Sequence, residues 1–516
     1  SIGLYFQDDF KATRSLTLNL GLRWDANPNF LQPQLRDSLT NSNRAIWALR
    51  QTLLANPTDP AAQEGLGEIR SLVGDESLLR KRTADWKEFQ PRIGFAWDVT
   101  GNGKHVIRGG YGIARDQIFQ NLTLWSIQQS QPSIYQIVLN QTSSARPGGG
   151  ACEGELCTFQ FGKTPLPAPA GTINDLAFGA VGRMTNPRIT DPWSQQMSIG
   201  WAWQVSPDYA FSVDYTHILG THEERVLNAN PRIRTVCNPD YGGNPADPRC
   251  VAGADTRLLD AAFQAANICG PTLAGQECGA GRFAHIYNYS TNNRSLYDAI
   301  NFQLRKRLTH RITFQTSYVL SWSRSWGGFP VAAYLGSGFA VDPQQQFAPN
   351  EFNRTNNDER NRFTFSGVFT LPGGIELSPL FQAASGRPFS YLAGDDIDGD
   401  GRVVIDRACV GSTLSNRIVT PGCTMLPPNT LTGKPLIQMD LRTSKIVKLS
   451  ERVNMRLSVE FFNLFNRANF CNDYQEDSSA SNFNQPLGFC GGPSGNGFSA
   501  AAVPSLHTQG GIRFEF

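Results

Sequence analysis

The chain has 516 residues, and its 46 Lys and Arg against 44 Asp and Glu leave a net charge of +2. This balance excludes the strong positive field with which many proteins bind nucleic acid. No run approaches the roughly 18 consecutive apolar residues of a transmembrane helix, so a helical membrane protein is excluded. The first residues, SIGLYFQDDF, lack the basic and apolar regions of a signal peptide. The chain therefore either stays in the cytoplasm or lacks its native N-terminus.

Apolar and polar residues alternate with a period of two in many segments along the chain. In residues 16–24, Leu and Trp at the even positions alternate with Thr, Asn, Gly and Arg. Such a strand has one apolar and one strongly polar face. We predict thirteen strands, at residues 2–9, 16–25, 89–99, 105–115, 193–205, 208–219, 296–307, 311–322, 362–371, 375–384, 436–448, 453–464 and 506–516. Most have about ten residues, the length of a tilted strand that crosses a membrane.

The connections between these strands differ in length by parity. Those after odd strands are short turns, whereas those after even strands are long, at residues 26–88, 116–192, 220–295, 323–361, 385–435 and 465–505. Short periplasmic turns and long extracellular loops are typical of outer-membrane barrels. The sequence thus predicts an all-β fold, an antiparallel transmembrane β-barrel in the outer membrane of a Gram-negative bacterium. Because single-chain bacterial barrels normally have an even number of strands, thirteen strands and no signal peptide predict missing upstream sequence; a strand missed in this count is the alternative.

All ten cysteines lie in the long loops, and each loop that has any holds an even number. They are Cys152 and Cys157; Cys237, Cys250, Cys269 and Cys278; Cys409 and Cys423; and Cys471 and Cys490. No Cys-x-x-Cys pair of the kind that binds zinc is present. This pattern predicts disulfides within each loop, formed in an oxidising compartment. In the four-cysteine loop we expect neighbours to pair.

Two loops also contain apolar residues at helical spacing. Ile46, Leu49 and Leu53 predict a helix near Ala45–Ala55. A second helix is predicted from Leu258, Ala262, Ala265 and Cys269. We interpret both as packed loop helices.

One aspartate-rich segment resembles the first half of a calcium-binding loop. Its candidate ligands are Asp396, Asp398 and Asp400 at loop positions 1, 3 and 5, with Gly401 at position 6 and Asp406 near the end. Position 12 is Arg407, where a bidentate Glu is expected, so Asp406 is the substitute. The segment is either a plain Asp/Gly-rich turn or a structural Ca²⁺ site, and the sequence establishes no cofactor.

Aromatic residues stand near the strand ends, as in the interfacial girdles of membrane barrels. They include Trp24, Trp97, Trp322 and Trp326. The chain ends in an alternating strand with Phe514 and Phe516, which predicts a signal for the barrel-assembly machinery; an ordinary last strand is the alternative. The polar face carries Asn19, Arg23, Arg108, Asp214, Arg305, Arg456 and Glu460. These suit a wet lumen or a polar plug better than a dry core.

No residues indicate an enzyme. A Gly-x-Ser-x-Gly elbow, a His-Glu-x-x-His helix and a phosphate-binding loop are all missing from the sequence. His217 and His222, followed by Glu223 and Glu224, have no fixed metal-binding geometry at the end of a strand.

Several segments, taken in order, resemble the barrel of TonB-dependent outer-membrane receptors. YFQDDFKATRSLTLNLGLRWD is similar to their "QDDW" strand and the "LTLNLGLRYD" strand after it. DPWSQQMSIGWAWQ, VDYTHILGTH, SLYDAINFQLRKRLTHRITFQTSYVLSWS and NDERNRFTFSGVFTLPGG resemble hairpins of the OmpA-related, Oar-like branch. VNMRLSVEFFNLFNRANF resembles the penultimate strand, with its E-x-F-N-L-F-N signature at Glu460 to Asn466.

This resemblance implies a barrel of about 22 strands with an N-terminal plug, energised through the TonB complex. Residues 1–516 are then the C-terminal part of the barrel, without the plug, the N-terminal regions and about nine strands. The implied function is active import, or export, of a bulky extracellular ligand. Siderophores, cobalamin, glycans and peptides are all compatible. A plugless outer-membrane pore or a surface adhesin, and a soluble secreted β-rich protein such as a glycan-binding module, are the alternatives.

Overall fold

The computed structural model describes residues 2–26, 43–74, 77–80, 85–118, 183–250, 256–265, 287–327, 347–395, 406–410, 424–470, 474–489 and 505–515. Within these ranges no helix has the length and apolar character needed to cross a membrane.

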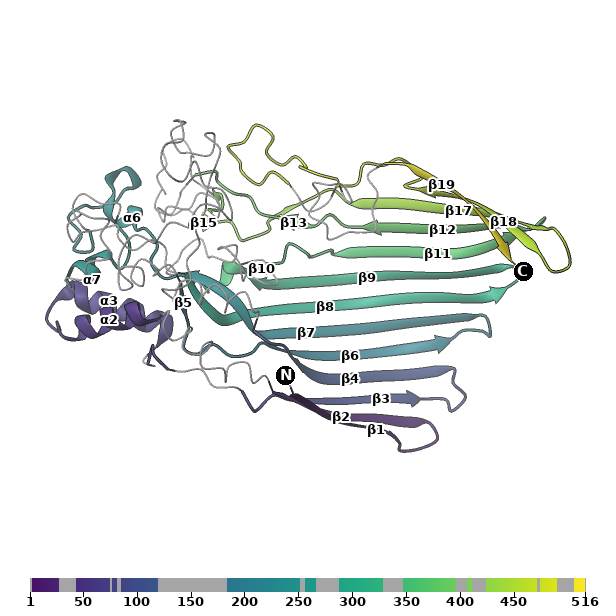
Figure 1. Cartoon of the computed structure of the whole chain (residues 1–516), viewed down its shortest axis with the longest axis horizontal. Helices are drawn as coiled ribbons and strands as arrows, with labels where there is room; N and C mark the ends of the chain where they lie inside the picture. The colour runs from purple at the N-terminus through teal and green to yellow at the C-terminus, as the bar shows by residue number, and fades with distance from the viewer. Residues whose placement is uncertain are drawn as a thin grey trace, which may run out of the picture.

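Thirteen long strands form one antiparallel sheet in which each strand pairs with the next along the chain (Figure 1). They are β1 (Ile2–Lys11), β2 (Leu16–Ala26), β3 (Phe89–Asp98), β4 (His105–Arg115), β6 (Trp193–Gln204), β7 (Tyr209–Asn228), β8 (Tyr287–Thr309), β9 (Ile312–Trp326), β11 (Asn361–Leu371), β12 (Ile375–Ala384), β17 (Leu436–Lys448), β18 (Asn454–Phe462) and β19 (His507–Glu515). All thirteen predicted strands are present, so the all-β antiparallel fold is confirmed. In the described part of the chain, β1 pairs only with β2, and β19 only with β18.

Figure 1 shows the short turns at one end of the sheet and the long connections at the other, together with the helices. The predicted parity of the connections is therefore confirmed. The β8–β9 turn shows how the backbone makes one of these short turns. His310 and Arg311 have φ of 51° and 66°, the left-handed conformation that matches the twist of a two-residue hairpin.

The predicted ends of two strands were wrong. β7 continues to Asn228, and β8 begins at Tyr287 rather than near residue 296. These extensions pair with each other across a bulge near His222, whose φ is 57°. Val226 and Leu227 are buried, as are most of their polar neighbours, so both faces of this part of the strand are covered. A strand that is buried on both faces shows no alternation of apolar and polar residues. The period-two pattern therefore predicted strand ends that lie short of the observed ones.

Three helices pack together at the loop end: α2 (Arg44–Leu54), α3 (Pro60–Val73) and α7 (Asp260–Ala265). α2 and α7 confirm the two predicted helices, although Cys269 lies outside the described residues. α3 was missed. Its start is marked by Asp59, whose carboxylate accepts the Ala62 N–H at 3.0 Å, followed by Pro60 at the first helical position. A Cβ on Gly65 would lie 2.3 Å from the Cβ of Ala262, so glycine permits the close contact between α3 and α7.

Short elements join the remaining loop segments. They are β5 (Arg183–Thr185), parallel to β8; β10 (Phe352–Arg354), beside β9; the pairs β13 (Pro388–Phe389) with β16 (Leu431–Thr432) and β14 (Cys409–Val410) with β15 (Thr424–Met425); and α6 (Arg234–Cys237), η4 (Pro239–Tyr241) and η5 (Pro349–Glu351).

Two of the predicted loop cysteines form a disulfide with each other. Cys237 is bonded to its neighbour Cys250, as expected. Cys409 is also disulfide-bonded. Cys152, Cys157, Cys269, Cys278, Cys423, Cys471 and Cys490 lie outside the described residues, so their pairing stays a prediction.

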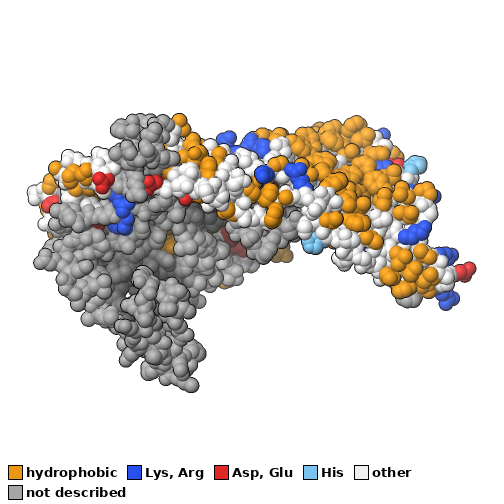
Figure 2. Space-filling model, turned by 90° about the horizontal axis from the view of Figure 1, so that it is seen from above, with side chains coloured by type: hydrophobic (Ala, Val, Ile, Leu, Met, Phe, Trp, Pro, Cys, Tyr) orange, Lys and Arg blue, Asp and Glu red, His pale blue; other side chains and the backbone are white. Residues whose placement is uncertain are grey.

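The strand register separates an apolar outer face from a polar inner face. On the outer face Leu18 lies opposite Phe10 and Phe95, and Trp201 lies opposite Ile107 and Val213. Figure 2 shows hydrophobic side chains covering much of one face of the strand half of the molecule. An apolar outer face is what a strand needs in order to lie against lipid.

The four tryptophans predicted at strand ends all lie on this outer face. By register, Trp97 is near the turns, and Trp24, Trp322 and Trp326 are near the loops. At the turn end, the His105 ring stacks on Trp201 and Trp203, with ring centroids 5.9 and 5.8 Å apart. Aromatic residues at both ends of an apolar band are typical of the two membrane interfaces.

Candidate functional site: the polar inner wall

The inner face carries the charged residues that the sequence predicted there. By register, Asn19, Arg23, Arg108, Asp214, Arg305, Arg456 and Glu460 all lie on it. Most form pairs across or along strands. Asn19 donates to Asp9 at 2.6 Å, Arg23 pairs with Asp25 at 2.7 Å and Arg442 with Glu460 at 3.3 Å. Arg456 joins Glu376 and Glu515.

One of these pairs joins two strands that are separated by a third strand. The Arg108 guanidinium on β4 contacts both carboxylate oxygens of Asp214 on β7, at 2.9 and 3.0 Å. Gly200 of β6 lies between them in the register. A Cβ on Gly200 would lie 1.9 Å from the Asp214 carboxylate, so only glycine leaves room for this contact.

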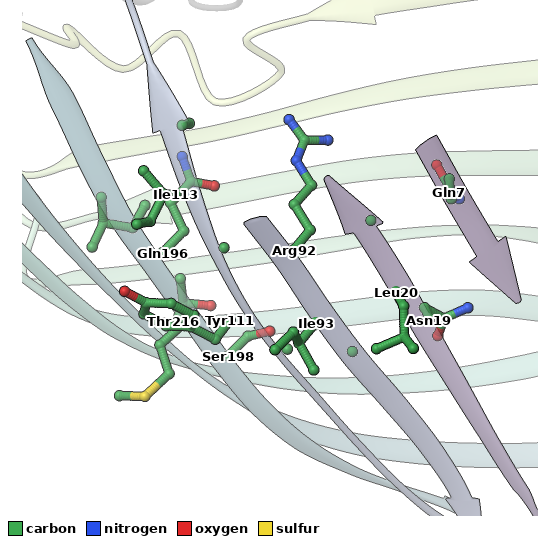
Figure 3. A pocket seen from close by; sticks show the side chains of 17 residues that line it. Gln7, Asn19, Leu20, Arg92, Ile93, Tyr111, Ile113, Gln196, Ser198 and Thr216 are labelled. Atoms are coloured by element: carbon green, nitrogen blue, oxygen red, sulfur yellow. The ribbon is translucent and has the colours of Figure 1, made fainter. Parts of the chain in front are cut away.

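The inner wall is hollowed beside this pair. The hollow has a volume of about 640 Å³ and lies over β1 to β4, β6 and β7. Figure 3 shows Asn19, Arg92, Gln196, Ser198 and Thr216 among the side chains around it. One cation and several neutral hydrogen-bonding groups therefore face the lumen here.

Glycines form the floor of the hollow. A Cβ on Gly21, Gly94 or Gly110 would meet its nearest atoms at ordinary distances of 3.7, 3.5 and 3.4 Å, respectively. Packing therefore does not require glycine at these three positions. By contrast, a Cβ on Gly109, which faces outward, would lie 2.7 Å from the Phe95 ring. Glycine weakens a strand, and an inward glycine that the fold does not require is typical of a place where another molecule or segment approaches the backbone.

A second hollow adjoins the first on its loop side. Its volume is about 410 Å³, and the two hollows share Ala114 and Gln196. Asp116, Glu223 and Glu224 line it, and Ser295 donates a hydrogen bond to Glu223. Arg115 lines it as well, so the continuous recess carries three carboxyl groups and one arginine toward the loops, and Arg92 deeper in the barrel.

A buried carboxyl pair lies at the base of the loops, just before β3. Glu88 and Asp191 are only 4% and 3% exposed. The pKa of Glu88 is raised to about 8, first because burial disfavours the charged form and second because of its hydrogen bond with Asp191. Glu88 is therefore a proton-binding group at neutral pH.

This pair makes the loop base sensitive to pH. Between the ordinary pKa of 4.5 and about 8, folded Glu88 holds a proton that the unfolded chain has released. Its contribution to stability is thus fully present below pH 4.5 and is lost as the pH rises to about 8. We expect the melting temperature of the loop base to decrease as the pH rises through this range, and to stay constant in the variant Glu88→Gln. An equal slope in both proteins would contradict this.

The predicted calcium loop lies mostly outside the described residues, which include neither Asp396, Asp398 nor Asp400. Asp406 is fully buried. Arg407 stands at loop position 12, where a calcium loop has Glu. It forms an ion pair with Glu351 and donates to the Leu426 carbonyl oxygen at 2.6 Å, and it therefore links two of the long connections. In the described ranges no three His, Cys, Asp or Glu residues form a metal-binding group. The Ca²⁺ site stays a prediction.

His217 and His222, which the sequence analysis considered as a metal cluster, lie in different places. His217 lies on the outer face, where its Nδ1 is 2.8 Å from Asp298, whereas His222 lies at the β7 bulge.

At the C-terminus, β19 places Phe514 on the outer face with 51% of its surface exposed, and Phe516 is outside the described residues. Their role as an assembly signal stays a prediction.

Sequence reasoning missed the recess in the wall. The signal was present, since Gly94, Gly110 and Gly112 occupy polar-face positions of two adjacent strands. Alternation identifies the face but not the gap that several glycines leave together. The buried Glu88–Asp191 pair gave no signal, because the two residues are far apart in sequence.

An antiparallel sheet with an apolar outer face, a polar recessed inner face, aromatic borders and turns at one end defines the wall of a transmembrane β-barrel. The family described as outer membrane beta barrel domain matches residues 1–489, and the chain belongs to this family. It is therefore a non-enzymatic protein of the Gram-negative outer membrane. None of the curated proteins matches the chain.

Solved structures similar to the chain include the outer membrane transporter YddB from Escherichia coli, with 9% identity and a TM-score of 0.46. The ferric enterobactin receptor PfeA from Pseudomonas aeruginosa has 10% identity and a TM-score of 0.44. The siderophore receptor PiuA from Acinetobacter baumannii has 10% identity and a TM-score of 0.41. Each alignment covers 99% of this chain but only 44%, 44% and 42% of those chains, respectively. The chain thus spans less than half the length of these structures.

Proposed function

We propose that the chain is the C-terminal wall of a TonB-dependent outer-membrane transporter of the Oar-like branch, which imports a bulky ligand through a plug-gated barrel. The recess in the inner wall carries the proposal, because inward glycines that packing does not require leave space for the plug or the ligand. The sequence resemblance described above supports the TonB-dependent class.

In the part of the chain that the structure describes, the two outer strands of the sheet, β1 and β19, each have one unpaired edge, which supports the proposal that the whole protein has further barrel strands and a plug. Unpaired strand edges are unfavourable in lipid, so β1 and β19 need partners to close a barrel. Further strands of the same protein would supply them. The extracellular loops would capture the ligand, and the polar wall would guide it once TonB displaces the plug.

The test uses cells that express the full-length protein with and without TonB. Depletion of siderophores, cobalamin, glycans and peptides from the medium is measured in parallel. We expect one class to be depleted only when TonB and the proton-motive force are present. Depletion that continues without TonB would contradict this proposal and favour a diffusion pore.

A variant of the recess tests the role of the wall. Gly110→Phe places a ring in the hollow, because the Cβ itself fits at 3.4 Å from the nearest atom. We expect about tenfold slower uptake, with normal assembly. The control is Ala202→Phe, at an inward position of β6 that does not line either hollow. Equal uptake by both variants would remove the recess from the pathway.

A further inference from the structure

The recess in the inner wall carries opposite charges at its two ends. Among the described residues that line the deeper hollow, Arg92 is the one charged side chain. Three carboxyl groups and one arginine line the hollow nearer the loops: Asp116, Glu223, Glu224 and Arg115. Arg115 also lies 3.9 Å from Asp85, a carboxylate outside the hollow, so it balances the three carboxyl groups only in part. A cationic group is therefore favoured near the loops, and an anionic group deeper in the barrel.

The positive charge of Arg92 is only partly balanced. Its side chain is exposed, and Figure 3 shows its guanidinium group extending away from the strands. Its charge acts on Asp25, but that carboxylate is bound by the Arg23 guanidinium at 2.7 Å and by the Gln90 amide. One carboxylate thus faces two guanidinium groups, and Arg92 forms no hydrogen bond or ion pair with another described residue. An anionic group in the hollow would supply the missing negative charge.

The strand register gives the distance between the two charged ends. Arg92 pairs with Gly112 of β4, and Asp116 follows four residues later toward the loops. Glu223 of β7 is at a similar height, since it lies five residues beyond Ile218, which is level with Gly112, and a bulge separates them. With a rise of about 3.3 Å per strand residue, the ends are roughly 13 Å apart. An extended peptide of about four residues has this length.

Between the two ends the wall offers hydrogen-bonding groups and little bulk. Gln196, Ser198 and Thr216 line the deeper hollow, and Gln196 also lines the other one. Gly110 and Gly112 of β4 pair with Ser198 and Gln196, so the wall beside these polar groups has no side chains. A peptide backbone has a donor and an acceptor at almost every residue, and it can lie close to such a wall. A neutral glycan would use the same groups but would leave both charged ends without a counter-charge.

We propose that the recess binds a zwitterionic peptide of about four residues by its two ends. Its α-carboxylate lies at Arg92, and its α-ammonium group lies at the carboxyl groups near the loops. The inference rests on the proposed transport function, because it names the class of ligand carried. A guanidinium group binds a carboxylate through two parallel hydrogen bonds, and an ammonium group donates up to three. A peptide with a blocked end leaves one end of the recess without its counter-charge, so the site rejects it.

The experiment measures how tightly the immobilised full-length protein retains tetrapeptides, with mass spectrometry as the readout. The probe is a pool of tetrapeptides with Ala at both ends and randomised middle positions. The same pool is used with free ends, with an N-terminal acetyl group, and with a C-terminal amide. We expect the wild type to bind the free pool at least about tenfold more tightly than either blocked pool.

Two variants test the ends of the recess separately. Arg92→Gln should bind the free and the amidated pools equally, while the acetylated pool stays weaker. Asp116→Asn/Glu223→Gln should bind the free and the acetylated pools equally, while the amidated pool stays weaker. The matched control is Arg305→Gln, which removes an exposed inner-face arginine outside both hollows and should bind as the wild type does.

No retention of the free pool, or equal retention of free and blocked pools by the wild type, would overturn the proposal. Discrimination that is unchanged in both variants would overturn the assignment of the two ends. Heat-modifiable mobility in gels shows that each variant has assembled, and should one fail to assemble, the other still tests its own end.

Uptake assays separate this inference from the proposed function. TonB-dependent uptake of another ligand class, without peptide binding, would overturn the inference and leave the transporter function standing. Peptide binding with the expected discrimination but without TonB-dependent uptake would support the site and contradict the proposed function.

Discussion

Replacing Phe302 by arginine should prevent most of the protein from assembling. Phe302 is on the outer face of β8, opposite Val213 and Tyr318, in the middle of the apolar band. Arginine near the bilayer midplane costs about 2–4 kcal/mol, which lowers the ratio of folded to unfolded protein about 30- to 900-fold. The heat-modifiable fraction of the full-length protein in outer membranes measures this loss.

Two controls separate lipid exposure from other effects. Gln303→Arg introduces the same charge one residue later, on the inner face, and should assemble normally. Phe302→Leu removes the contact with the Tyr318 ring, whose centroid is 6.1 Å away, without adding charge. Similar losses for Arg at positions 302 and 303 would mean that the two faces are assigned incorrectly.

Removing the carboxylate of Glu351 should open the base of the loops. Glu351 and Arg407 have only 3% and 4% of their side-chain surface exposed, and they form an ion pair. Arg225, which is fully buried, is also subject to the charge of Glu351. Glu351→Ala leaves these buried cations without that carboxylate, which typically costs 3–5 kcal/mol. Faster hydrogen exchange around β10 and β14 would report the local opening.

The double variant Glu351→Leu/Arg407→Met tests whether the loss comes from an uncompensated charge. Apolar replacement of both partners of a buried pair is often nearly neutral, so we expect most of the protection to return. Arg513→Ala, which breaks an exposed pair 3.7 Å from Glu515, should change stability by less than about 1 kcal/mol. Equal effects of Glu351→Ala and Arg513→Ala would show that burial is unimportant.

The sequence predicted the sheet well because half of each strand faces lipid and half faces the lumen. That environment forces alternation, as in Leu16–Trp24, and alternation is visible in the sequence alone. The same reasoning failed where the environment was uniform. Residues 224–228 of β7 are buried on both faces and therefore show no period of two.

The candidate site was predicted only as a polar face. Arg108 and Asp214 were assigned to it correctly, but their contact depends on Gly200 of a third strand. Contacts between distant residues, such as Glu88 with Asp191 or Glu351 with Arg407, depend on how the loops fold back. Local sequence patterns do not encode those contacts.

The most direct test of the account is a spin-label scan of residues 211–216 in β7, in the full-length protein in outer-membrane vesicles. Labels on a noncanonical amino acid leave the native cysteines untouched. We predict that positions 212, 214 and 216 collide with a water-soluble nickel complex, and that 211, 213 and 215 collide with oxygen dissolved in lipid. Equal accessibility to the nickel complex at all six positions would contradict a membrane barrel wall with a polar lumen.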